Sequence, residues 1–151
     1  MLQVNQMKQM PNVIFLPVKT NQHKIGCICY SIQTHFAKGE AILIIAPSEQ
    51  AVQYLDDLLW KFPDDSFLPH VVSQSPCKEK VVITTLSQNL NSAKILMNLC
   101  PESCSIAEQF EIIYELYDET HPEKLEQSKR RHQTYSQKSF NIKDLKEKKD
   151  N

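Results

Sequence analysis

Two short apolar runs flank a helical pattern in the first third of the chain. Residues 12–18 and 41–46 have almost no polar interruption, as in strands buried on both faces of a sheet. The residues between them predict a helix that begins after Thr20 or Asn21 and ends at Gly39. Its apolar positions recur at helical spacing: Ile25, Ile28, Cys29, Ile32 and Phe36. Strand, helix and strand in this order predict parallel pairing through a right-handed crossover.

A second amphipathic helix follows the 41–46 run. Ser48 is its expected N-cap, and Glu49 places a negative charge at the positive end of the helix dipole. Pro63 ends the helix, because proline lacks an N–H and disfavours helical geometry at Phe62. Its apolar stripe consists of Ala51, Val52, Leu55, Leu58 and Leu59.

The remaining pattern completes an α/β fold. Strands are predicted at 81–84, 95–99 and 112–117, although the second of these is short enough to be a helical turn. Residues 71–72 precede a polar turn, residues 86–94 a loop, and residues 106–110 a short helix. We therefore expect residues 1–142 to form a single α/β domain with a mostly parallel, Rossmann-like sheet flanked by helices. Residues 143–151 are expected to be a charged, frayed tail.

The last predicted helix differs from the others. Pro122 is well placed to open it, and Leu125 and Tyr135 are nearly its only apolar side chains, with Phe140 and Ile142 following as a last apolar contact. Lys124, Arg131, Tyr135 and Lys138 fall on one side of the helix, with Lys129 and His132 adjacent to that stripe.

This basic helix has three possible roles. A charged helix face is most often simply solvated. An aromatic ring among cations, however, suits an acidic peptide with an apolar end, because the cations hold carboxylates and the pocket holds the side chain. Stacking on single-stranded nucleic acid uses the same residue types, so direct nucleic-acid binding stays an alternative.

A second candidate surface follows the Ser48 helix and contains the single tryptophan. The segment is too polar for a core strand and too apolar for an ordinary loop. Either its aromatic rings fold onto the core, or they are exposed anchors for a protein partner. The residues concerned are Trp60, Phe62, Phe67, Pro69 and His70.

The pattern Leu55-x-x-x-Leu59-Trp60, followed by Ser66-Phe67-Leu68-Pro69-His70, resembles the chi subunit of bacterial DNA polymerase III. The resemblance extends over most of the chain, and only this block and the end are specific. It implies a non-catalytic accessory subunit of the polymerase III holoenzyme. It also implies that the Trp60 block binds the psi subunit, which joins chi to the clamp loader, or a helicase in its place.

The same resemblance implies that the last helix receives the acidic, phenylalanine-ending C-terminal tail of single-stranded-DNA-binding protein, so that contact with DNA is indirect. Lys129 stands where a relative has an arginine, and His132 and Gln133 where it has tyrosine and lysine. Lysine lacks the planar fork of arginine, so these changes bear on affinity more than on the mode of binding. The tail-binding residues are predicted to be Lys124, Lys129, Arg131, His132 and Tyr135.

Composition argues against other functions. The net charge of −1 argues against a generally basic nucleic-acid-binding protein. Only Gly26 and Gly39 are present, and neither follows a strand in a phosphate-cradling pattern, so we expect no cofactor and no catalysis. A small nucleotide-binding enzyme remains the least favoured alternative, on the fold alone.

The cysteines and the N-terminus add two expectations. The five cysteines have no convincing metal-ligand spacing and are expected to be unpaired thiols, with no metal site. No apolar run approaches the roughly 20 residues that a membrane span needs. Residues 1–10 are polar and lack the apolar stretch of a signal peptide, so the cytoplasm is the expected location.

Overall fold

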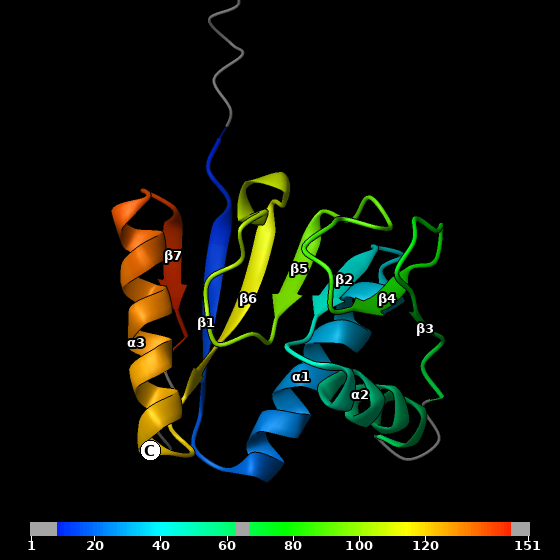
Figure 1. Ribbon diagram of the computed structural model, residues 1–151, viewed down its shortest axis with the longest axis horizontal. Coiled ribbons are helices and arrows are strands. Elements are labelled where there is room, and N and C mark those ends of the chain that lie inside the picture. The colour runs from blue at the N-terminus through cyan, green and yellow to red at the C-terminus, as the bar shows by residue number, and fades with distance from the viewer. Residues whose placement is uncertain (1–8, 63–66, 146–151) are drawn as a thin grey trace, which may run out of the picture.

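The computed structural model describes residues 9–62 and 67–145, and in this part of the chain seven strands form one sheet (Figure 1). The strand order is β3-β4-β2-β5-β6-β1-β7, and every pairing is parallel. The strands are β1 (Asn12–Val18), β2 (Ile42–Ile45), β3 (Val71–Val72), β4 (Val81–Thr84), β5 (Ile95–Asn98), β6 (Ile112–Asp118) and β7 (Asn141–Asp144). The helices are α1 (Asn21–Ala37), α2 (Glu49–Lys61), the short 3₁₀ helix η2 (Ala107–Gln109) and α3 (Pro122–Gln137). The predicted α/β class is confirmed.

Continuous apolar runs form the central strands because both faces of the sheet are covered. All residues of β2, β4 and β5 are buried. β1 and β6 pair along their whole length, from Asn12 opposite Ile112 to Val18 opposite Asp118. The strand prediction for residues 95–99 is therefore confirmed over its helical alternative.

Local signals set the helix boundaries. The side chain of Thr20 accepts a hydrogen bond from the His23 amide at 3.0 Å, and that of Ser48 accepts one from the Ala51 amide at 3.1 Å. Gly39 follows α1 with φ of +75°, a left-handed conformation that glycine adopts without steric penalty. Pro122 occupies the first turn of α3. The predicted starts of all three helices are confirmed.

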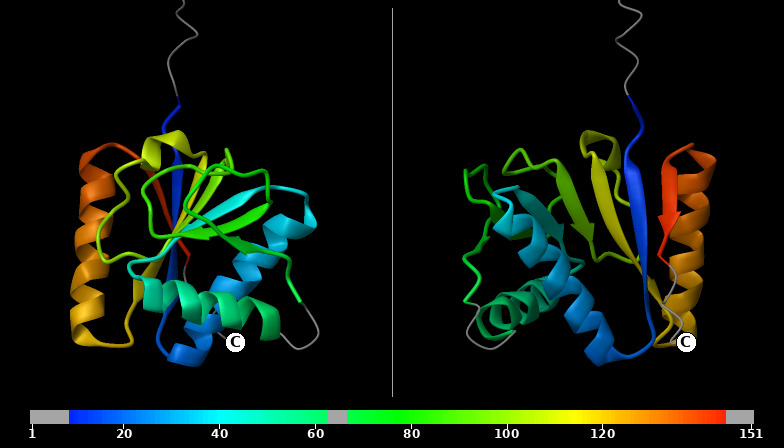
Figure 2. Two further views of the ribbon diagram at one scale, coloured as in Figure 1. Left: turned by 45° about the vertical axis from the view of Figure 1, so that its right-hand side comes forward. Right: turned by 180° about the vertical axis from the view of Figure 1, so that it is seen from behind.

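Each face of the sheet has its own covering layer and its own core. One core joins α1 and α2 to the sheet through residues such as Ile32 and Leu59. The other core includes Tyr135 of α3 and Ala107 of η2. Figure 2 shows α1 and α2 side by side, while α3 runs along the β1–β7 end of the sheet. No helix in the described ranges is long and apolar enough to cross a membrane.

Three details differ from the expectations. Residues 71–72 form an edge strand, β3, and the short helix at 106–110 is a single 3₁₀ turn. Residues 143 and 144 belong to β7 rather than to a frayed tail, because the open edge of β1 supplies parallel backbone pairing from Asn12 to Phe15. An edge strand tolerates charged side chains, which explains why the apolar pattern did not reveal it. The expected tail from residue 146 onward lies outside the described residues.

Candidate functional site

The aromatic rings at the end of α2 face solvent. Trp60 is 42% exposed and Phe67 is 64% exposed, which rules out the interpretation that both rings are folded into the core. Phe62 and Pro69 are exposed as well. Phe67 has φ of 43°, a backbone conformation that a bulky residue rarely adopts. Large exposed rings grouped in this way are typical of a protein-binding surface.

His70 lies beneath this surface and is not part of it. Its side chain is fully buried, with the ring centroid 4.3 Å from that of Trp60. Nε2 lies 2.7 Å from Oδ1 of Asp56 on α2, and Nδ1 lies 2.7 Å from the carbonyl oxygen of Leu68. The role of His70 as a contact residue stays a prediction; in this structure His70 ties the 67–70 segment to α2 and lies against the indole ring of Trp60.

The fold directs the predicted binding residues of α3 to different sides of the helix. Tyr135 is 1% exposed and Arg131 is 7% exposed, so both side chains are largely buried, although Arg131 lines the same hollow as Lys124. Their role as tail-binding residues stays a prediction, and the structure shows both side chains bonded inside the fold. The sequence pattern correctly placed Lys124, Arg131 and Tyr135 on one side of the helix, but Arg131 and Tyr135 face the sheet rather than solvent.

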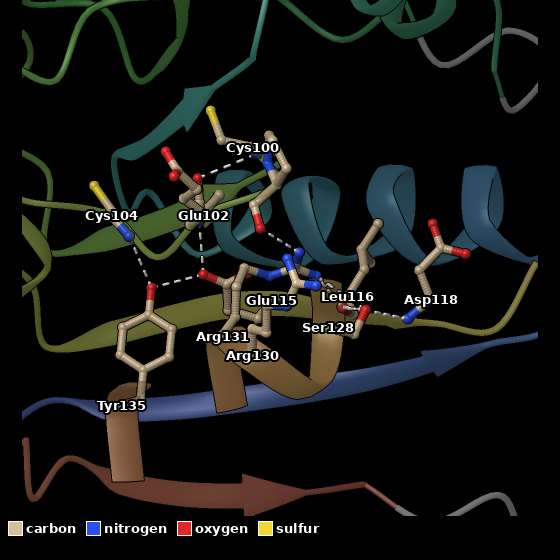
Figure 3. A network of polar contacts seen from close by, with 12 residues as sticks. Cys100, Glu102, Cys104, Glu115, Leu116, Asp118, Ser128, Arg130, Arg131 and Tyr135 are labelled. Carbon is tan, nitrogen blue, oxygen red and sulfur yellow. Dashed lines mark hydrogen bonds and ion pairs between the residues drawn. The ribbon is translucent and has the colours of Figure 1, made fainter. Parts of the chain in front are cut away.

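Arg131 and Tyr135 meet at Glu115, a fully buried carboxylate in the middle of β6 (Figure 3). The Tyr135 hydroxyl donates to Oε2 of Glu115 at 2.6 Å, and the side-chain amide of Asn98 donates to the same oxygen at 2.7 Å. Nε of Arg131 lies 2.8 Å from Oε1 of Glu115. A buried ion pair therefore joins α3 to the sheet.

The guanidinium of Arg131 also ties α3 to the surrounding backbone. It donates to the carbonyl oxygens of Pro101, at 3.0 Å, and Leu116, at 2.7 Å. The Cys104 amide donates to the Tyr135 hydroxyl at 3.2 Å. α3, whose sequence has few apolar side chains, is therefore held by buried polar bonds in addition to apolar packing.

Burial dominates the electrostatics of this network. It raises the pKa of Glu115 to about 7, although the charge of Arg131 and the hydrogen bonds from Tyr135 and Asn98 lower it. Burial also raises the pKa of Cys100 to about 11 and that of Cys104 above its ordinary value. These two thiols are protonated at neutral pH, so the arrangement does not supply an activated nucleophile.

Lys129 and His132 project from another side of α3 and border a hollow of about 300 Å³. Its apolar lining comes from Phe15 and Pro17 of β1 and from Tyr117 of β6. The His132 ring lies against Phe15, with centroids 4.8 Å apart. The hollow thus combines an apolar floor with a lysine and a histidine at its rim. Its remaining lining residues are Asp144 and Leu145.

The hollow opens where β7 ends. Asp144, the last residue of β7, is level with Phe15, and Pro17 lies two positions further along β1. The Phe15 carbonyl accepts a hydrogen bond from the Leu145 amide at 3.2 Å, so the backbone polar groups of Phe15 point toward β7. Because these groups alternate sides along a strand, those of Pro17 point the same way. Pro17 has no N–H that the end of β7 would leave unpaired.

Sequence reasoning missed the floor of this hollow. Phe15, Pro17 and Tyr117 occur in strand patterns and were interpreted only as sheet residues. A proline inside a strand does signal a position without ladder pairing, and this was the one available clue. Lys124, in contrast, lines a separate hollow of about 430 Å³, together with Lys24 and Asp118, and lies apart from Lys129 and His132.

A family comparison agrees with this architecture. The family model described as DNA polymerase III chi subunit, HolC, matches residues 10–143. The chain belongs to the chi subunit family. A search of curated proteins found no match.

Membership makes the protein an accessory subunit of DNA polymerase III that associates with other components of that complex. The match spans the exposed aromatic surface of Trp60, Phe62, Phe67 and Pro69 (the Trp60 surface) and the whole of α3, and it ends one residue before Asp144. Within the described part of this chi-family protein, no cluster of three or more His, Cys, Asp or Glu side chains has the arrangement of a metal site.

Replacing Arg131 by Met is expected to destabilise the chi-family protein by about 3–5 kcal/mol at pH 7, because Glu115 loses its buried partner. The pKa of Glu115 in the fold exceeds its unfolded value of 4.5. The stabilisation that this group provides is therefore fully present below pH 4.5 and is lost as the pH rises through about 7. Arg131→Met raises this pKa further, so the deficit should widen as the pH rises through about 7 and above it, where Glu115 ionises in the unmodified protein but stays protonated in the variant. Urea unfolding at several pH values measures it.

The exposed neighbour Arg130 provides the matched control. Arg130→Met removes the same charge and should change the unfolding free energy by no more than about 0.5 kcal/mol at any of these pH values. Equal effects of the two substitutions would contradict a buried Glu115–Arg131 pair.

Proposed function

We propose that this chi-family subunit connects DNA polymerase III to single-stranded-DNA-binding protein and has no catalytic activity of its own. In this proposal the hollow beside α3 receives the acidic C-terminal tail of that protein. The Trp60 surface binds psi, which connects chi to the clamp loader, or a helicase that takes its place. The observation that carries the proposal is an apolar hollow bordered by Lys129 and His132.

The chemistry of the hollow suits such a tail. Phe15, Pro17 and Tyr117 form an apolar floor that complements a terminal phenylalanine ring. Lys129 is exposed and His132 is partly exposed, so both can pair with ligand carboxylates through charge-assisted hydrogen bonds. The volume of about 300 Å³ lies at the lower end of the range for ligand pockets, as expected for one side chain.

The arrangement gives less support to direct binding of single-stranded nucleic acid. Base stacking needs an accessible aromatic ring among the cations. Tyr135 was the candidate for that role, and its ring is in the core with its hydroxyl bonded to Glu115. The aromatic residues of the hollow belong to its floor, where they favour an inserted side chain over a stacked base.

Replacing Lys129 by Ala is expected to weaken binding of a labelled tail peptide about three- to ten-fold, because one exposed charge pair is lost. Fluorescence anisotropy measures the affinity, and the difference should shrink as salt is raised. Lys138→Ala, which removes an exposed cation that does not line the hollow, is the control and should have little effect. A peptide without its terminal phenylalanine should bind much more weakly, and equal binding of the two peptides would refute the apolar pocket.

Replacing Trp60 and Phe67 together by Ala is expected to abolish the complex with psi or the substituting helicase. A central aromatic anchor typically contributes on the order of 2 kcal/mol or more, so the double variant should lose at least a hundred-fold in affinity. Co-purification and calorimetry measure this loss. Tyr30→Ala on α1 removes another strongly exposed ring and serves as the control. Unchanged affinity of the double variant would reject this surface.

A further inference from the structure

The hollow beside α3 contains a carboxylate of its own. Nε2 of His132 lies 3.1 Å from Oδ1 and 3.3 Å from Oδ2 of Asp144, so both carboxylate oxygens approach the same ring nitrogen. His132 comes from α3 and Asp144 from the end of β7, and both side chains line the hollow. The pair therefore links two elements across the rim.

The position of His132 limits how it can respond to a ligand. Its ring lies against Phe15 in the floor, which restricts the directions in which Nε2 can point. The Asp144 side chain is 58% exposed and extends from the last residue of an edge strand. Of the two, the aspartate is the side chain with more freedom to move.

Lys129, the other polar side chain at the rim, is held less closely. Nζ of Lys129 lies 3.9 Å from Oε2 of Glu126, one turn earlier on the same helix, and both side chains are more than half exposed. An exposed pair at this distance is weak, so Lys129 is available to an incoming carboxylate. Nε2 of His132, in contrast, is already occupied by Asp144, which a ligand must displace to reach that nitrogen.

We infer that Asp144 is a specificity-determining residue of this hollow. In the free protein its carboxylate occupies the position on His132 that a ligand carboxylate takes on binding. This inference rests on the proposed function of the hollow. A ligand with a single carboxylate exchanges one carboxylate for another on His132 and gains little. A tail that also engages Lys129 and inserts an apolar side chain gains contacts that Asp144 does not supply.

The test measures binding of an acidic peptide ending in phenylalanine to four forms of the full chain by anisotropy. These are the unmodified protein, Asp144→Asn, His132→Gln and the double variant. Asp144→Asn keeps the shape of the side chain and removes its charge, and it is expected to tighten binding about two- to five-fold. In the His132→Gln background the same change is expected to have no effect, because the competition acts through the imidazole.

A charge control separates competition from general repulsion. Glu123→Gln removes an exposed carboxylate from the first turn of α3, away from the lining of the hollow, and should leave the affinity unchanged. Binding that appears only when Asp144 is replaced would also support the inference.

Two results overturn the inference while tail binding stands. One is unchanged affinity in Asp144→Asn, and the other is a gain of the same size with and without His132, which would mean simple charge repulsion. Absence of peptide binding in all four forms would instead overturn the proposed function, and the inference with it.

Discussion

A buried carboxylate determines how the last helix lies on the sheet. Glu115 is in the middle of β6 with no exposure to solvent; it accepts hydrogen bonds from Tyr135 and Asn98 and forms an ion pair with Arg131. A buried ion pair gains little net free energy, because both charges must leave water. A missing partner, however, is costly, so this cluster penalises any rotation of α3 that withdraws Arg131 or Tyr135. Its contribution is to the orientation of the helix.

That orientation determines which charges the chi-family protein presents. Arg131 and Tyr135 are directed at β6. His132, about a quarter of a turn away, and Lys129, about two-fifths of a turn away, border the hollow above Phe15 and Tyr117. The early end of β7 leaves this hollow open on the side of Pro17. One polar cluster and one short edge strand thus place polar side chains, Lys129 and His132 among them, around an apolar floor.

The Trp60 surface is built in a similar way on a smaller scale. An exposed ring that must meet a partner benefits from a fixed position, because binding then loses less side-chain entropy. His70 supplies this support from below, through Asp56 on α2 and the Leu68 carbonyl. In both places buried polar side chains hold a helix or a ring whose outer side is available for binding.

Local patterns in the sequence were enough for the main elements of the fold. These features depend on residues that are close together in the chain, so the sequence alone indicates them: the buried strands, the helix caps at Thr20 and Ser48, the proline start of α3 and the chi-family resemblance. The side of α3 that faces the core cannot be predicted from neighbouring residues. Arg131 and Tyr135 have the residue types of a binding stripe, and they face inward only because their buried partner, Glu115, lies on β6. Asp144 likewise reaches His132 because β7 pairs in parallel with β1, a contact between segments that are distant in the chain. Periodicity reports which residues share a face, whereas the partner of that face is decided by long-range packing.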